Sequence, residues 1–206
     1  MPLPPDQGPM PPALSNGHDR SVPPPAAPLT VDDMLMGGLA IDTWLKVSKF
    51  GMTIGEDATI FDSIPVELHF AEVQYCFGVR YGNPAVYVRT YDHVTDTKGR
   101  YWHEVLRLAR EVDPEAAEFP TADVPFVILA DLRDRRGALL GEAGDALGHS
   151  ISVTGWKFFQ RFLRTAQRSW IDIHVGAVRL DLGFEAQSNQ KGDWGVLTFT
   201  NIQRLK

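Results

Sequence analysis

Two apolar runs in the last quarter of the chain constrain the fold more than any other feature. Ile171–Ala186 and Trp194–Ile202 flank a short polar stretch that contains Lys191 and Gly192. This succession predicts a β-hairpin, and a two-stranded hairpin is only marginally stable alone in water. Its apolar face therefore needs a cover. The helical pattern of Thr154–Trp170, which immediately precedes the hairpin, is the candidate for that cover.

The predicted helix has two opposed faces. Apolar residues recur at steps of three and four, which places on one side Trp156, Phe159, Leu163, Ala166 and Trp170. The sequence predicts that this side is buried. Cations recur on the side turned away from it, at Lys157, Arg161, Arg164 and Arg168. Aligned cations can follow the phosphates of a nucleic acid. The alternative is a solvated face that is partly paired with acidic residues elsewhere.

Charge is unevenly spread along the chain. The formal net charge is −6, which excludes a globally basic protein that coats DNA. Residues 156–206 hold eight Lys and Arg against four Asp and Glu, whereas residues 48–155 hold ten against seventeen. This asymmetry fits a surface that faces a polyanion, and it fits equally well two regions that complement each other within the fold.

The N-terminal region differs in composition from the rest. Residues 1–29 hold ten of the fifteen prolines. Such a segment lacks the hydrogen-bond donors and apolar area needed to fold, so we predict a disordered tail with polyproline II character. It could present ligands to a protein partner, or simply keep the chain in solution. Residues 30–47 predict a short helical segment or linker, and residues 48–206 a single β-rich globular domain.

The central region predicts short strands around one further helix. Alternating segments predict strands at Thr59–Phe70, Val73–Arg80 and Val86–Thr90, and the nearly continuous apolar run Val124–Leu132 predicts a strand buried on both faces. Helical spacing predicts a helix over Tyr101–Val112, and Pro120 and Pro125 bracket a predicted loop. Gly141, Gly144 and Gly148 predict a second loop region. The predicted fold class is α+β, a mainly antiparallel sheet or partly closed, OB-like barrel with two packed helices.

A second group of residues interleaves aromatic rings and cations. From it we select as binding residues Arg80, Tyr87, Arg89 and Arg100. Single-stranded nucleic acid is held in this way, with bases stacked on rings and phosphates met by Lys or Arg. Aromatic residues are also common in any strand, where many are buried. Lys191 would stand at the hairpin tip near Trp194, where it could contact a nucleic-acid strand or a protein, or face solvent.

The sequence offers no enzymatic signature. Its histidines are dispersed, and no spacing typical of metal ligands is present. Cys76 is the only cysteine, which excludes an intramolecular disulfide, and we expect it to be a small buried hydrophobe. We predict no catalytic residue, metal or cofactor. No apolar run approaches the roughly 18 residues of a membrane span, and no signal peptide is evident, so the predicted location is cytoplasmic.

The leading hypothesis is a non-enzymatic module that binds single-stranded nucleic acid. The predicted binding residues are Arg80, Tyr87, Arg89, Arg100, Lys157, Arg161, Arg164, Arg168 and Lys191. The competing hypothesis is a structural or assembly protein, such as a component of a phage particle or a scaffold, that contacts proteins through its acidic bulk and Pro-rich N-terminus. Clustered cations beside exposed tyrosines would favour the first hypothesis, and an exposed apolar patch the second.

Overall fold

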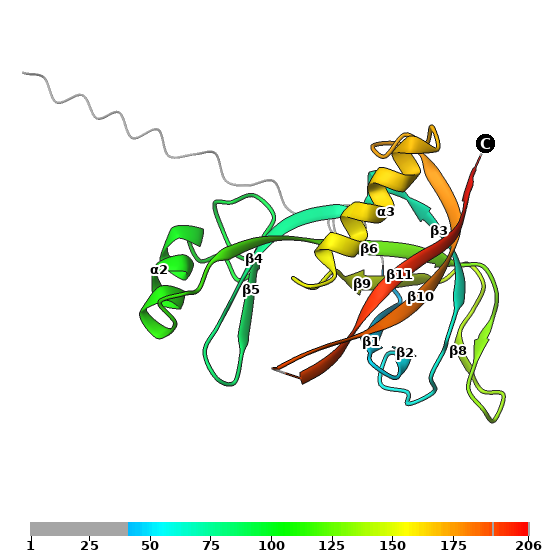
Figure 1. The fold of residues 1–206 in the computed structure, drawn as a ribbon, viewed down its shortest axis with the longest axis horizontal. Coiled ribbons are helices and arrows are strands. Elements are labelled where there is room, and N and C mark those ends of the chain that lie inside the picture. Colours follow the sequence, from blue (N-terminus) through cyan, green and yellow to red (C-terminus); the bar gives the residue numbers. More distant parts are fainter. Residues whose placement is uncertain (1–40, 191, 206) are drawn as a thin grey trace, which may run out of the picture.

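The computed structural model describes residues 41–190 and 192–205. Within them it is mostly β-sheet with two α-helices, which confirms the α+β class (Figure 1). The strands are β1 (Thr43–Ser48), β2 (Gly51–Ile54), β3 (Ile64–His69), β4 (Gln74–Tyr81), β5 (Val86–Thr90), β6 (Glu118–Ile128), β7 (Leu132–Arg133), β8 (Leu139–Gly141), β9 (Ala146–Ser150), β10 (Ala177–Asn189) and β11 (Gly192–Arg204). The helices are α2 (Trp102–Val112), α3 (Trp156–Arg168) and the short 3-10 helix η1 (Phe70–Glu72).

Nine of these strands form one open sheet. Its order is β11-β10-β3-β6-β9-β1-β2, and β4 pairs with β6 and with β5. Of the two predicted alternatives, the mainly antiparallel sheet is confirmed, and the partly closed, OB-like barrel was wrong because no ladder joins β2 to β11 among the described residues. The two ends of the sheet meet by packing instead. A Cβ at Gly195 of β11 would lie 2.1 Å from the backbone oxygen of Ser48 in β1, so only glycine fits there.

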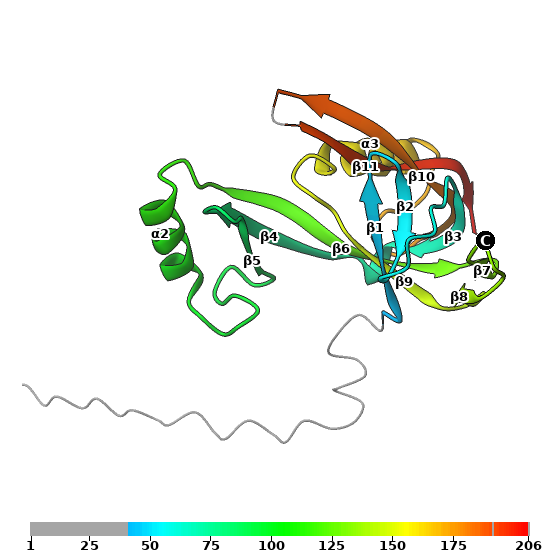
Figure 2. The same cartoon turned by 90° about the horizontal axis from the view of Figure 1, so that it is seen from below.

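The long strand β6 is the spine of the sheet. Glu118–Asp123 pairs with β4, and Asp123–Val127 pairs with β9 (Figure 2). The loop that we predicted between Pro120 and Pro125 is therefore wrong. Among the described strands, Pro120 is paired on one side only, with β4, and Pro125 is paired on one side only, with β9. A strand with one open side tolerates proline, because the missing N–H can fall on that side.

The described part of the chain forms two hydrophobic cores. We call the larger unit the body: β1–β3, the second half of β6, β9–β11 and α3 surround buried side chains such as Phe126, Phe159 and Leu182. We call the smaller unit the lobe: α2 lies against the β4–β5 hairpin. Its core is formed by Val79, Val88, Trp102, Val105, Ala109 and Ala116. Figure 1 shows the lobe projecting from the body, with β4 and β6 leading into it.

The C-terminal hairpin and its helical cover are confirmed. Phe159, Phe162 and Ala166 of α3 are buried, and the Phe162 ring stacks on Phe199 of β11 with centroids 4.4 Å apart. Trp156 and Leu163 pack against the same core. The predicted core role of Trp170 was wrong, because α3 ends at Arg168 and Trp170 is 87% exposed with a φ of 58°.

Two further predictions need correction. Residues 43–48 form strand β1 rather than part of a helical segment, because they pair with β2 and β9. The predicted glycine-rich loop contains β9, where Gly148 allows close approach: a Cβ there would lie 2.6 Å from the Ile41 side chain. The tail predicted for residues 1–29 and the first part of segment 30–47 lie outside the described residues.

Cys76 is buried, as expected. Burial raises the pKa of its thiol to about 11, and the nearby Asp123 carboxylate adds to the shift. The thiol is therefore protonated at neutral pH. Within residues 41–190 and 192–205, no helix combines the length and apolar character that crossing a bilayer requires.

Candidate functional site

A groove runs between the lobe, the tip of the β10–β11 hairpin and the first turns of α3. Its largest part has a volume of about 580 Å³ and is lined by Val47, Arg80, Tyr87, Ser152, Thr154, Asn189, Gly192, Asp193, Trp194 and Gly195. Thr154 and Trp194 also line a second hollow of about 170 Å³, together with Lys157 and Phe158. Phe158 in turn lines a third hollow of about 160 Å³. Neighbouring hollows share lining residues, so the three hollows follow one another along α3, and we call this succession the path.

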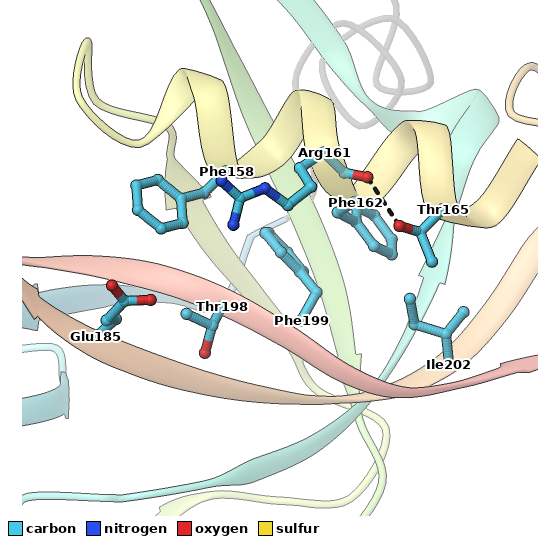
Figure 3. A pocket seen from close by; sticks show the side chains of 8 residues that line it. All are labelled: Phe158, Arg161, Phe162, Thr165, Glu185, Thr198, Phe199 and Ile202. Carbon is cyan, nitrogen blue, oxygen red and sulfur yellow. Dashed lines mark hydrogen bonds between the residues drawn. The ribbon is translucent and has the colours of Figure 1, made fainter.

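The third hollow lies between α3 and the hairpin. Figure 3 shows Phe158 and Arg161 on the helix above, with Glu185 and Thr198 on the strands below. The Arg161 side chain extends toward the Phe158 ring, at 5.5 Å from the ring centroid. The stacked rings of Phe162 and Phe199, which also line this hollow, make its inner side apolar.

Three cations lie over aromatic rings along this path. Arg80 is 5.5 Å from the Tyr87 ring centroid, on the lobe side. Lys157 is 5.1 Å from the centroid of Phe158, the ring that Arg161 also approaches. None of these three cations forms an ion pair with another described residue. Cation–π contacts of this kind contribute about 0.5–1 kcal/mol at exposed sites, so they orient the cations while leaving the charge available.

Trp194 stands where the first two hollows meet. Its indole N–H is buried and has no hydrogen-bond partner among the described residues. The neighbouring Asp193 carboxylate is paired, accepting hydrogen bonds from Lys49 Nζ at 2.8 Å and from the Ser188 hydroxyl at 2.6 Å. These two contacts hold the pKa of Asp193 below its ordinary value. The hairpin tip is therefore anchored to the β1–β2 turn by an ion pair.

The basic stripe of α3 is exposed along its whole length. Lys157, Arg161, Arg164 and Arg168 are all solvent-accessible and stand opposite the buried face, as the helical period requires. Arg164 and Arg168 line none of the three hollows, and neither takes part in an ion pair between described residues. The stripe thus extends the cationic wall of the groove outward onto the helix surface.

Two of the predicted binding residues are engaged elsewhere. Arg89 Nη1 donates to Asp123 Oδ1 at 2.6 Å, and Arg100 Nη2 lies 2.6 Å from Asp96 Oδ2. Each guanidinium already has a carboxylate partner, and neither Arg89 nor Arg100 lines the groove. Lys191 lies outside the described residues.

Sequence reasoning missed two features of this site. The first is Phe158, an aromatic residue that lies outside the predicted apolar stripe of α3. Its position next to Lys157 in the sequence was the available signal for a ring beside a cation. The second feature is a polar network around Asp123, whose partners are distant in sequence.

No protein-family profile, curated protein or solved structure matches this chain.

Proposed function

We propose that this protein binds single-stranded nucleic acid along the groove, without catalysing a reaction. The observation that carries the proposal is the row of three cations, Arg80, Lys157 and Arg161, each over an aromatic ring and each without a carboxylate partner among the described residues. Proteins hold single strands with this combination, because rings stack on bases while cations neutralise the backbone.

The geometry favours a single strand over a duplex. Tyr87 is 58% exposed, and Trp194 and Phe158 line the groove, so these rings are presented at its walls. A base can stack on such a ring only when it has left its own stack, which costs little in a single strand. Phosphate contacts carry no base information, and every base has a π-face. We therefore expect binding that depends weakly on sequence.

The test is a salt series with a labelled single-stranded oligonucleotide. The variant Lys157→Gln with Arg161→Gln removes two cations from the groove. The slope of log K against log salt is negative, and each lost contact to a single strand makes it about 0.7 less steep, so we expect it to become less steep by about 1.4. The loss of affinity should be similar for all base sequences.

A matched variant controls for net charge. Arg135→Gln with Arg136→Gln also removes two exposed cations, in the turn between β7 and β8. Figure 1 places β8 on the side of the body away from the lobe. This variant should keep the wild-type slope. The proposal is wrong if the wild type does not bind at low salt. It is also wrong if both double variants reduce the steepness of log K against log salt by the same amount.

One observation favours the alternative role in assembly. Trp170 and Val175 are 87% and 74% exposed in the turn between α3 and β10, which is an unusual place for two large apolar side chains. If the protein assembles through this turn, Trp170→Ala should lower its self-association or its capture of a partner. Sedimentation velocity of the wild type and this variant, with Phe50→Ala as an exposed aromatic control, tests that role.

A further inference from the structure

The two walls of the groove belong to different cores. Arg80 and Tyr87 lie on the β4–β5 hairpin of the lobe, whereas Thr154, Lys157 and Trp194 belong to the body. Figure 2 shows β4 and β6 as the ribbon through which the lobe joins the body. The width of the groove therefore depends on how that ribbon is held.

Asp123 lies where β6 changes its partner. It is the last residue of β6 that pairs with β4, opposite Gln74, and the first that pairs with β9, opposite Ser150. Among the described residues, strand β5 pairs with β4 alone, so no ladder there connects β5 to the body. Any direct connection between β5 and the body must come from side chains.

The Asp123 carboxylate supplies that connection. Its Oδ1 accepts hydrogen bonds from Arg89 Nη1 at 2.6 Å and from the Ser150 hydroxyl at 2.5 Å. Its Oδ2 accepts one from the Tyr91 hydroxyl at 2.6 Å. Arg89 Nη1 also donates to Ser150 Oγ at 2.9 Å. Arg89 belongs to β5 and Tyr91 follows it directly, so one carboxylate joins the end of β5 to β6 and β9.

The network is specific in its chemistry. Asp123 is only 4% exposed, and a buried carboxylate is tolerated where an ion pair and further hydrogen bonds compensate it. Burial, and then the hydrogen bond to Asp123, raise the pKa of Tyr91, so its hydroxyl stays protonated and keeps donating. Loss of one partner would leave the buried Asp123 carboxylate with too few hydrogen bonds or no opposite charge to offset its removal from water.

Arg89 and Tyr87 are two positions apart on β5 and therefore project from the same face of the strand. Resting on the proposed function, we propose that Asp123 is a positioning residue, which holds β5 so that Tyr87 and Arg80 face Trp194 across the groove. Asp123 would act through β5 and would not touch the nucleic acid.

The first test needs no nucleic acid. Nitroxide labels on Ala85→Cys, at the exposed end of the lobe hairpin, and on Gln190→Cys, at the tip of the β10–β11 hairpin, report the distance between the two walls. Cys76 is buried with a raised pKa, so labelling at neutral pH is directed to the introduced cysteines. We expect a narrow distance distribution in the wild type and a broader one with Asp123→Asn. Tyr91→Phe, a milder change, should broaden it less. An unchanged distribution in both variants would overturn the proposal.

The second test is a pair of double-mutant cycles on oligonucleotide affinity. If Asp123 acts by placing Tyr87, Asp123→Asn should weaken binding about tenfold alone but by less than about twofold in a Tyr87→Ala background. The same change should add to Lys157→Gln, because that cation lies on the opposite wall. If the effect of Asp123→Asn on affinity added fully to that of Tyr87→Ala as well as to that of Lys157→Gln, Asp123 would have a merely structural role.

Tyr91→Phe replaces Asp123→Asn in these cycles if the latter does not fold. Failure of the wild type to bind would count against the proposed function, whereas the label distances would still decide the role of Asp123.

Discussion

The lobe and the body are held together by different kinds of contact. The lobe core draws on side chains from Phe77 to Ala116, a continuous stretch of the chain. The body collects strands from both ends of the described chain, and β1 lies beside β9. The lobe core is thus built from one stretch of the chain, whereas the body requires segments from both ends of the described chain to pair. Because the groove lies between the two, the proposed binding surface requires both.

The largest expected effect is in the body. Phe159 is fully buried and packs against the rings of Trp156, Phe162 and Phe199. Phe159→Ala should lower the free energy of unfolding by about 3–5 kcal/mol, the usual range for a buried ring. Urea unfolding measures this loss. Phe50→Ala, at a ring that is 67% exposed, should change stability by no more than about 0.5 kcal/mol.

The corresponding change in the lobe should act more locally. Trp102, the first residue of α2, is buried in the lobe core, and its indole N–H donates to Glu118 Oε2 at 2.5 Å. Trp102→Ala should cost about 3 kcal/mol, felt mainly by the lobe. Native-state hydrogen exchange should show faster exchange in α2 and β5 while the amides of β10 keep their protection. Equal loss of protection everywhere would mean that lobe and body unfold as one cooperative unit.

A smaller effect concerns pH and the body alone. Removal from water lowers the pKa of His149, although its Nδ1–H donates to Leu45 O at 3.1 Å. As pH falls below the ordinary value of 6.5, the unfolded chain therefore binds a proton that the folded chain does not. Stability should fall in this range, by up to about 1.4 kcal/mol per pH unit.

The check is the pH dependence of urea unfolding between about pH 7 and pH 5.5, where the unfolded histidine titrates. His149→Gln should flatten this dependence, whereas His103→Gln, at an exposed position on the lobe, should leave it unchanged. If His103→Gln flattened it equally, the source of the pH dependence would not be His149.

The smallest effect compares single cations on the two walls. Arg80→Gln and Lys157→Gln each remove one exposed charge. Each should make the negative slope of log K against log salt, measured for oligonucleotide binding, less steep by about 0.7. Folding should be nearly unchanged, since exposed substitutions shift stability by about 0.5 kcal/mol or less. A normal slope for Arg80→Gln would restrict the interface to the body.

Local patterns in the sequence were sufficient for several elements. The alternation of Val86–Thr90 predicts β5 with its observed bounds, and the helical spacing around Phe159 predicts α3. The same periodicity predicts that the four cations of α3 face solvent. These features follow from the period of a strand or helix and need no knowledge of what packs beside it.

Other features depend on partners far along the chain. Arg89 is committed to Asp123 and Ser150, which lie 34 and 61 positions away, and an acidic chain offers many carboxylates that could have paired with it. Pro120 and Pro125 are compatible with a strand only because β6 has an open side at each of them. The sheet stays open because its two ends meet where Gly195 packs against Ser48, without a ladder of backbone hydrogen bonds between their strands. None of these is encoded in a local pattern.

The parallel pairing of β1 with β9 has a consequence for how the chain is made. Thr43 pairs with Leu147, so β1 cannot find this neighbour until the whole segment between them has left the ribosome. The lobe core lies wholly within that segment, between Phe77 and Ala116, so it can form before β9 is available. Until β9 emerges, β2 is the one described strand with which β1 can pair, and an unpaired strand edge is the part of a nascent chain most exposed to wrong partners. The order of synthesis thus favours an early lobe and a late body.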